Sequence, residues 1–237
     1  MRADADGVWG QLPGPCLSGD RWATTLLALE LDHVLLAVAD LAAAAQGIEA
    51  RHGLASIEGG RHPGWGTANR IVPLGEAYLE LVAVVDEDEA AQSPFGRWVA
   101  AAHPSLPRLL GWAVRTHELD DFARRLDLTV AAGSRTDRNG QHVRWRLAGI
   151  DQATAEPSLP FFIEWEHGTP LPGRAPVTHR AGAVQIATLR LAGDADRLAA
   201  WLGAHRLPIT VRPGTPAVAS IVLTGAAGEI VLDNDRM

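Results

Sequence analysis

The hydrophobic and polar positions of this chain follow a pattern that repeats. HVLLAVADL, starting at His33, and GWAVRTHEL, starting at Gly111, align without a gap at an offset of 78 residues. In each stretch, about seven strand-like residues give way to a helical pattern of about ten residues. A third copy over 187–207 places Ala187 at the equivalent position, 76 residues after Gly111. The repeat predicts three structural modules.

Three further strand patterns follow each predicted helix, separated by turn signals rich in glycine and asparagine. They lie at 55–60, 67–74 and 77–85, at 128–135, 141–149 and 159–167, and at 208–214, 218–225 and 229–233. Each module is therefore β-α-β-β-β, and the fold class is α+β. One such module cannot bury both faces of its sheet. Two paired modules would form a curved sheet around a cleft, with helices outside and the third module appended.

The runs LDHVLLAVADL, GGRHPGWGTANRIVPLGEAYLELVAVVD, GWAVRT and FFIEWEHG, in this order, resemble the glyoxalase-like domain family. This family belongs to the vicinal oxygen chelate superfamily, which includes glyoxalase I, extradiol dioxygenases and bleomycin-resistance proteins. The resemblance implies a glyoxalase-like domain over 29–175, with paired modules at 29–86 and 107–168. We expect a loosely ordered N-terminal extension over 1–28 and a third module, over 180–237, packed on the domain.

The superfamily places metal ligands on the first and last strands of each module. Strand alternation puts His33 on the cleft side, and Glu80 shares a strand face with Tyr78. Glu164 matches Glu80 by motif in the second module. Gly111 stands at the fourth ligand position, where it offers no side chain. The resemblance thus implies a metal set of His33, Glu80 and Glu164, with Glu80 and Glu164 also candidates for catalytic proton transfer.

Two interpretations of this set stay open. Three protein ligands with water suit a divalent ion such as Mn, Fe, Mg, Ni or Zn. Alternatively the cleft is metal-free, and Glu80 and Glu164 pair with His33 or with arginines, because a buried carboxylate needs a partner.

Five residues are candidates for substrate binding. Tyr78 and Asn69 are expected to face the cleft. Arg144 in QHVRWRL could bind a carboxylate or phosphate or neutralise Glu164, and the alternative is a solvated strand face. The loop GGRHPGWGTANR is too long for a two-residue turn and is a candidate lid at the cleft mouth. Its Trp65 either stacks on a ligand or anchors the loop, and its His62 could reach a ligand or replace the metal ligand lost at Gly111.

Composition removes several classes of function. The formal net charge of −7 argues against nucleic acid and anionic membranes as partners. All 21 basic residues are arginine, which excludes Schiff-base lysine chemistry and the P-loop, so no nucleotide cofactor is expected. The single cysteine excludes a disulfide framework within one chain. Neither a membrane-spanning run nor a secretory signal is present, so a cytoplasmic monomer or homodimer with a small-molecule ligand is expected.

Two hypotheses of function follow. The first is an enzyme of lyase, isomerase or dioxygenase type that acts on a small polar molecule, with a cleft metal as Lewis acid. The second is a metal-free protein that binds or sequesters a small molecule, as the bleomycin-resistance proteins do. The paired carboxylates favour the first hypothesis, and Gly111 favours the second.

Overall fold

The computed structural model describes residues 10–11, 29–103, 107–136, 140, 142–226 and 228–234. The expected N-terminal extension over 1–28 therefore lies outside the described residues, apart from the two-residue strand β1 (Gly10–Gln11). The strands of the described residues form one eight-stranded sheet and one five-stranded sheet. No helix in these ranges is both long and apolar enough to cross a membrane.

The eight-stranded sheet is built from two modules of the same topology, in the strand order β3-β4-β5-β2-β6-β9-β8-β7. The first module comprises β2 (Glu30–Ala37), α1 (Leu41–His52), β3 (Ile57–His62), β4 (Thr67–Leu74) and β5 (Ala77–Val84). The second comprises β6 (Arg108–Arg115), α4 (Leu119–Leu126), β7 (Val130–Thr136), β8 (His142–Ala148), α5 (Ile150–Ala155) and β9 (Phe161–Trp165). The modules meet where β2 pairs antiparallel with β6, which confirms the predicted α+β fold of paired β-α-β-β-β modules.

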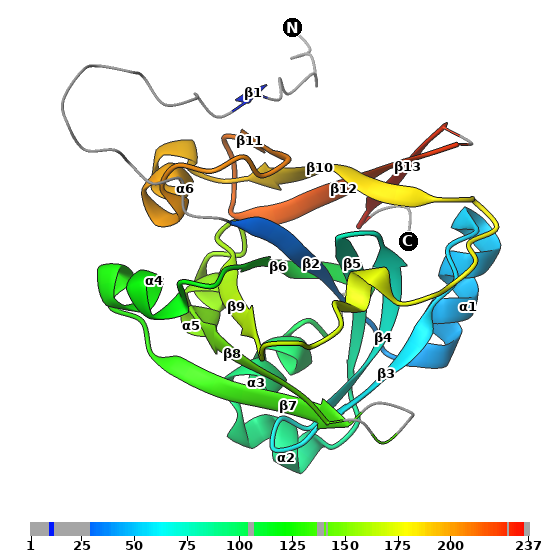
Figure 1. Cartoon of the computed structure of the whole chain (residues 1–237), viewed down its shortest axis with the longest axis horizontal. Coiled ribbons are helices and arrows are strands. Elements are labelled where there is room, and N and C mark those ends of the chain that lie inside the picture. The colour runs from blue at the N-terminus through cyan, green and yellow to red at the C-terminus, as the bar shows by residue number, and fades with distance from the viewer. Residues whose placement is uncertain are drawn as a thin grey trace, which may run out of the picture.

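The curved sheet nearly closes on itself, because its edge strands β3 and β7 approach each other (Figure 1). The Arg135 guanidinium on β7 donates a hydrogen bond to the Gly59 carbonyl oxygen on β3. Gly60 has φ +139°, and a Cβ at this position would lie 2.5 Å from the Thr136 carbonyl oxygen. Glycine is thus required where the two edges meet, since only it combines this backbone conformation with so close an approach.

Helices cover both faces of the curved sheet. As predicted, α1 and α4 lie on the outer face (Figure 1). The short helices α2 (Glu87–Gln92) and α3 (Pro94–Ala101) follow β5, and side chains of α3 and α5 pack against the concave face. Asp86 and Ser93 cap α2 and α3 by accepting from the backbone amides of Glu89 and Gly96. Side chains of α3 and α5 therefore fill much of the concave side.

The C-terminal segment has the predicted order of elements but a different strand pairing. It contains β10 (Val184–Ala192), α6 (Ala195–Leu202), β11 (Ile209–Arg212), β12 (Ala217–Gly225) and β13 (Gly228–Asp233). Here the first strand, β10, lies in the middle, parallel to β11 and antiparallel to β12. In the first two modules the first strand instead pairs in parallel with the last. The C-terminal sheet is therefore not a third copy of the paired-module topology.

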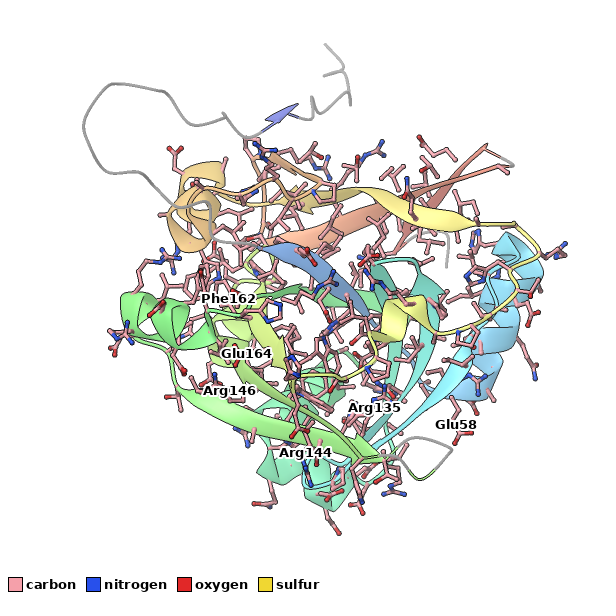
Figure 2. The ribbon with its side chains drawn as sticks, viewed as in Figure 1. Glu58, Arg135, Arg144, Arg146, Phe162 and Glu164 are labelled. Carbon is pink, nitrogen blue, oxygen red and sulfur yellow. The ribbon has the colours of Figure 1, made fainter. Side chains whose placement is uncertain are left out.

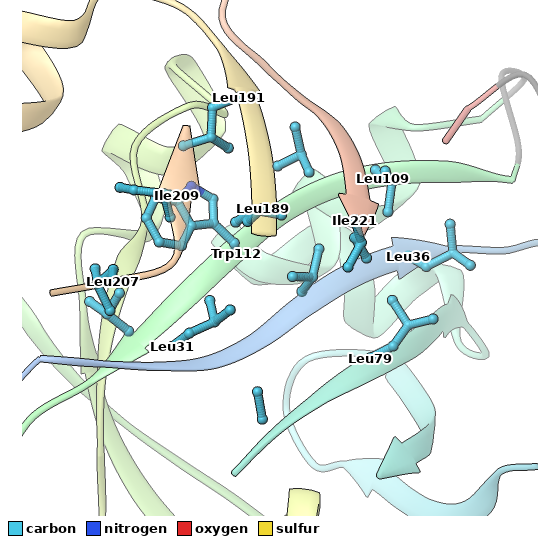
Figure 3. Packing of buried hydrophobic residues seen from close by; sticks show 14 of the residues in the cluster. Leu31, Leu36, Leu79, Leu109, Trp112, Leu189, Leu191, Leu207, Ile209 and Ile221 are labelled. Atoms are coloured by element: carbon cyan, nitrogen blue, oxygen red, sulfur yellow. The ribbon is translucent and has the colours of Figure 1, made fainter. Parts of the chain in front are cut away.

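The two sheets share one hydrophobic core. Figure 3 shows residues of β2, β5 and β6 packed against residues of the C-terminal sheet: Leu31, Leu36, Leu79, Leu109, Trp112, Leu189, Leu191, Leu207, Ile209 and Ile221. Trp112 is fully buried, and its indole Nε1 donates to the Ser158 carbonyl oxygen at 3.0 Å. The C-terminal sheet thus covers the convex side of β2 and β6, while the concave side of the same strands faces the pocket.

Candidate functional site

A small pocket lies inside the curved sheet and draws side chains from both modules. Its polar lining consists of His33, His62, Asn69, Tyr78, Glu80 and Arg135. The rest is mainly aromatic: Trp65, Phe95, Trp145, Phe161 and Trp165. The cavity volume is about 30 Å³, whereas a water molecule needs about 10–15 Å³. As it stands, the pocket holds a group the size of a carboxylate rather than a large molecule.

A β-bulge places two consecutive side chains where they can interact. The pairing between β2 and β6 shifts register between Leu31 and His33, so Asp32 is the extra residue. Asp32 Oδ1 lies 2.6 Å from His33 Nδ1, and both residues are buried. Asp32 Oδ2 accepts from the Trp165 indole Nε1 at 2.9 Å, which fixes the carboxylate. Because a carboxylate only accepts, His33 Nδ1 carries a proton and donates it to Asp32, and His33 Nε2 is the ring nitrogen that faces Glu80.

Glu80 is the second ionisable group at the centre of the pocket. Its side chain projects from β5, where alternation puts it on the same face as Tyr78, and it is 5% exposed. Asn69 Nδ2 on β4 donates to Oε1 at 2.9 Å, and His33 Nε2 lies 3.6 Å from Oε2. His62 Nε2 lies 4.0 Å from Oε1. The sequence-based placement of these five residues around one cleft agrees with this geometry.

His62 is held neutral by its surroundings. Burial lowers its pKa to about 4. The negative charge of Glu80 opposes this shift, and the positive charge of Arg135 adds to it. Its Nδ1 lies 2.9 Å from the Thr67 hydroxyl. At physiological pH, the neutral imidazole of His62 therefore lines the pocket as a hydrogen-bonding group.

Tyr78 keeps its proton over the physiological range. Burial raises the pKa of its phenol well above the ordinary value, and the negative charges of Asp32 and Glu80 raise it further. The ring stacks on His33, with centroids 4.7 Å apart. A protonated phenol in the lining can donate a hydrogen bond to an oxygen on which negative charge develops.

The glycine-rich loop that carries Trp65 is tied to helix α2. The Glu89 carboxylate accepts from the backbone amides of Gly64 and Gly66, one on each side of Trp65. The Trp65 ring packs on Phe95 of α3, with centroids 5.1 Å apart, and lines the pocket. The predicted lid segment therefore forms part of the pocket wall in this structure.

Packing of a neighbouring ring explains why position 111 is a glycine. His33 pairs with Ala113, and Leu35 pairs with Gly111, across the border between the modules. An approximate two-fold relation thus equates His33 with Gly111, as the sequence repeat did. A Cβ at Gly111 would lie 2.4 Å from the ring of Trp98 on α3. A tryptophan therefore occupies the space in which the second module would present a ligand.

The same symmetry corrects the placement of Glu164. Leu35 lies beside Glu80 on β5, and its counterpart Ala113 lies beside Phe161 on β9. The structural equivalent of Glu80 is therefore Phe161, which lines the pocket, and not Glu164. Because Glu164 lies three positions after Phe161 on the same strand, its side chain lies on the opposite face. The expected set of His33, Glu80 and Glu164 is not assembled.

Arg144 also lies outside the pocket. Figure 2 labels it with Arg146 and Glu164 along β8 and β9. Glu164 forms an ion pair with Arg146, which also contacts Asp120 at 2.9 Å. The Arg144 side chain is 64% exposed and lies 3.9 Å from Glu166. The solvated strand face, weighed above as the alternative for Arg144, is the arrangement observed.

Sequence reasoning missed two charged residues of the site. Asp32 contacts His33 beside the pocket, and the bulge that brings the two side chains together has no clear signature in the sequence. Arg135 lines the pocket from β7 and is 8% exposed. Gly133 and Arg135 are buried and alternate along β7 with exposed residues. Alternation alone does not say which face of a strand lies inside.

The residues around the pocket do not fit the metal that the superfamily resemblance implies. Among the described residues, no group of three histidine, cysteine, aspartate or glutamate side chains is arranged to hold an ion. Of the expected ligands, His33 and Glu80 face the pocket, whereas Glu164 pairs with Arg146 on the outer strand face and Gly111 offers no side chain. His33 and Glu80 remain in the pocket as groups that can themselves accept or donate a proton.

Comparison with known proteins establishes the family. Residues 31–207 match the family model described as a glyoxalase-like domain. This match covers well over half of the chain, so the protein belongs to the glyoxalase-like domain family, and the resemblance seen in the sequence is confirmed. No curated protein matches the chain.

Solved structures are similar to this chain at low sequence identity. A hypothetical protein from Staphylococcus aureus is 16% identical with a TM-score of 0.64, covering 82% of this chain and 90% of its own. Methylmalonyl-CoA epimerase from Mycobacterium tuberculosis is 22% identical with a TM-score of 0.42, covering 62% and 93%. A variant of the Streptomyces coelicolor methylmalonyl-CoA epimerase, in complex with 2-nitronate-propionyl-CoA, is 19% identical with a TM-score of 0.42, covering 59% and 97%.

The first of these matches bears on the C-terminal sheet. The eight-stranded sheet lies within residues 30–165, so a match over 82% of the chain must extend into the C-terminal segment. The S. aureus protein thus shares more of this fold than the paired modules alone.

Proposed function

We propose that this protein is an enzyme that moves a proton on a small polar molecule held in the pocket, as the first step of an isomerisation or an elimination. The observation that carries the proposal is the buried arrangement of Asp32, His33 and Glu80. Two groups able to carry a proton, His33 Nε2 and Glu80 Oε2, face each other at 3.6 Å beside a cavity. Positioned acid–base groups of this kind contribute about 10²–10⁴-fold to a rate.

Each surrounding residue has a role in this proposal. Asp32 holds the Nδ1–H of His33 and stabilises the positive charge that forms when Nε2 takes a proton. Asn69 orients the Glu80 carboxylate through its hydrogen bond. Tyr78, whose pKa is raised, donates to an oxygen that becomes negative when a neighbouring carbon loses its proton. The aromatic lining excludes water and strengthens these electrostatic effects.

Hydrogen exchange into small substrates tests the proposal. The protein is incubated in D₂O with a panel of 2-oxo acids, 3-oxo acids and hydroxy-ketones, and loss of C–H signals is followed by proton NMR. We expect exchange with at least one compound, and a loss of about 100-fold or more in His33→Gln and in Glu80→Gln. Glu164→Gln should keep the wild-type rate within about twofold, since its side chain pairs with Arg146 outside the pocket.

The comparison with Glu164→Gln tests whether Glu80, which the geometry places in the pocket, or Glu164, which the motif indicated, carries the activity. Loss of exchange in Glu164→Gln with retention in Glu80→Gln would overturn the assignment of the pocket residues. Saturable binding without exchange of any compound would overturn the proposal of an enzyme. It would favour the second hypothesis from the sequence, a protein that sequesters a small molecule.

A further inference from the structure

Arg135 is a charged side chain of the pocket lining that has no role in the proposed proton transfer. It projects from the edge strand β7 into the pocket that contains Glu80 and His62, and it is 8% exposed. Its charge lowers the pKa of His62, which shows that its field is felt across the cavity. Figure 2 labels Arg135 apart from Arg144 and Arg146, the two arginines of the outer strand face.

The guanidinium of Arg135 has few partners for a buried cation. Its one hydrogen bond within the described ranges goes from Nη1 to the Gly59 carbonyl oxygen, although the group carries five N–H donors. No carboxylate of the described residues lies within 4.0 Å of it, whereas Arg115, Arg146 and Arg174 each contact one. A buried charge without a counter-charge costs several kcal/mol. The protein keeps this cation at the wall of a cavity, where an anion can reach it.

We propose that Arg135 binds a carboxylate of the substrate, so that the ligand class is a small carboxylic acid with a carbonyl group next to the acid or one carbon further. The inference rests on the proposed function for the position of the reacting carbon, which would face His33 and Glu80. A planar guanidinium binds a carboxylate through two parallel hydrogen bonds, which fixes orientation as well as position. The cavity volume of about 30 Å³ suits a group of this size.

Binding of pyruvate and of pyruvamide to the full chain tests the assignment. The two compounds have nearly the same shape, but only pyruvate is an anion. By isothermal titration calorimetry, we expect wild type to bind pyruvate at least about tenfold more tightly, since charge-assisted pairs exceed neutral hydrogen bonds. Arg135→Gln should remove this preference, and Arg144→Gln, an outward-facing arginine on the neighbouring strand, should keep it. Inorganic phosphate is titrated as well, and tighter binding of phosphate than of pyruvate would overturn the carboxylate assignment.

A second measurement keeps the inference open to refutation if Arg135→Gln does not fold, since Arg135 also joins β7 to β3. In ¹⁵N-labelled wild type, the assigned side-chain Nε–Hε resonance of Arg135 should shift with pyruvate and not with pyruvamide. An unchanged resonance at saturation overturns the inference.

Glu80→Gln separates this inference from the proposed function. The variant lacks the carboxylate proposed to move a proton, but it retains Arg135. It should bind pyruvate at least as tightly as wild type, because a negative charge near the ligand is removed. Loss of its preference for pyruvate over pyruvamide would contradict the role of Arg135. Preference without hydrogen exchange in wild type would contradict only the proposed chemistry.

Discussion

At the scale of the residue, the pocket is a set of ionisable groups kept away from water. Asp32 is fixed by Trp165, Glu80 by Asn69, and His62 by Thr67, so most of the polar atoms have a defined partner. His62 differs from the others because burial opposes its protonation, and its pKa falls to about 4. A group of this kind links the stability of the fold to pH.

We expect His62 to destabilise the protein as the pH falls. Its pKa is 6.5 unfolded and about 4 folded, so between these values the unfolded state binds more protons, and the free energy of unfolding decreases toward pH 4 by up to about 3 kcal/mol. In urea titrations from pH 7 to pH 4, His62→Gln should show a weaker pH dependence than wild type. His117→Gln, at an exposed position, should show the wild-type dependence. Parallel curves for wild type and His62→Gln would contradict this linkage.

At the scale of the element, α3 decides which side chains reach the concave face of the sheet. It is inserted between the two modules, and its Trp98 packs where a Cβ of Gly111 on β6 would be. Trp98 also contacts Phe95 and Phe161 edge to face, at centroid distances of 6.2 and 6.3 Å. The rings of Trp98 and Phe161 thus occupy the positions in the second half of the sheet that are equivalent to His33 and Glu80 in the first.

We predict that Gly111→Ala destabilises the fold by about 1–3 kcal/mol, the usual cost of overpacking a core. The effect should be measured by urea unfolding monitored by circular dichroism. A double-mutant cycle with Trp98→Leu should recover much of the loss, because the smaller side chain vacates the space near the new methyl group. Gly214→Ala is the control, since the nearest atom to its Cβ would be at an ordinary 3.4 Å. Additive effects of Gly111→Ala and Trp98→Leu would mean that the ring is not the obstacle.

At the scale of the whole molecule, the two sheets share a core on the side away from the pocket. Leu36, Leu109 and Trp112 of the eight-stranded sheet are buried beneath β10 and β12 (Figure 3). Removing the C-terminal sheet would expose these side chains together, and an apolar patch of this kind promotes association or unfolding. The C-terminal segment therefore packs against the convex side of the strands that carry His33 and Ala113.

A chain that ends at residue 175 should not fold as a stable monomer. Size-exclusion chromatography and thermal unfolding would measure this directly, and a monomer that unfolds cooperatively near the wild-type temperature would contradict it. In the full chain, Ile221→Ala should cost about 2–5 kcal/mol because Ile221 is fully buried in the shared core. Val85→Ala, at a side chain that is 43% exposed, should cost much less.

The sequence by itself determined the elements and the first module's side of the site. The repeat at an offset of 78 residues predicted the paired modules, and strand alternation placed His33, Tyr78 and Glu80 on one face. These predictions succeeded because the period of a strand and the burial of apolar residues are local properties, readable from neighbouring positions.

Tertiary structure decided the strand register and the strand pairing, which local periodicity does not contain. The bulge at Asp32 made this residue the partner of His33, and strand pairing made Phe161, not Glu164, the counterpart of Glu80. The elements of the C-terminal segment were predicted, but their pairing around β10 was not. Register and pairing are set by contacts between distant segments, and Arg135 entered the site only because β7 closes against β3.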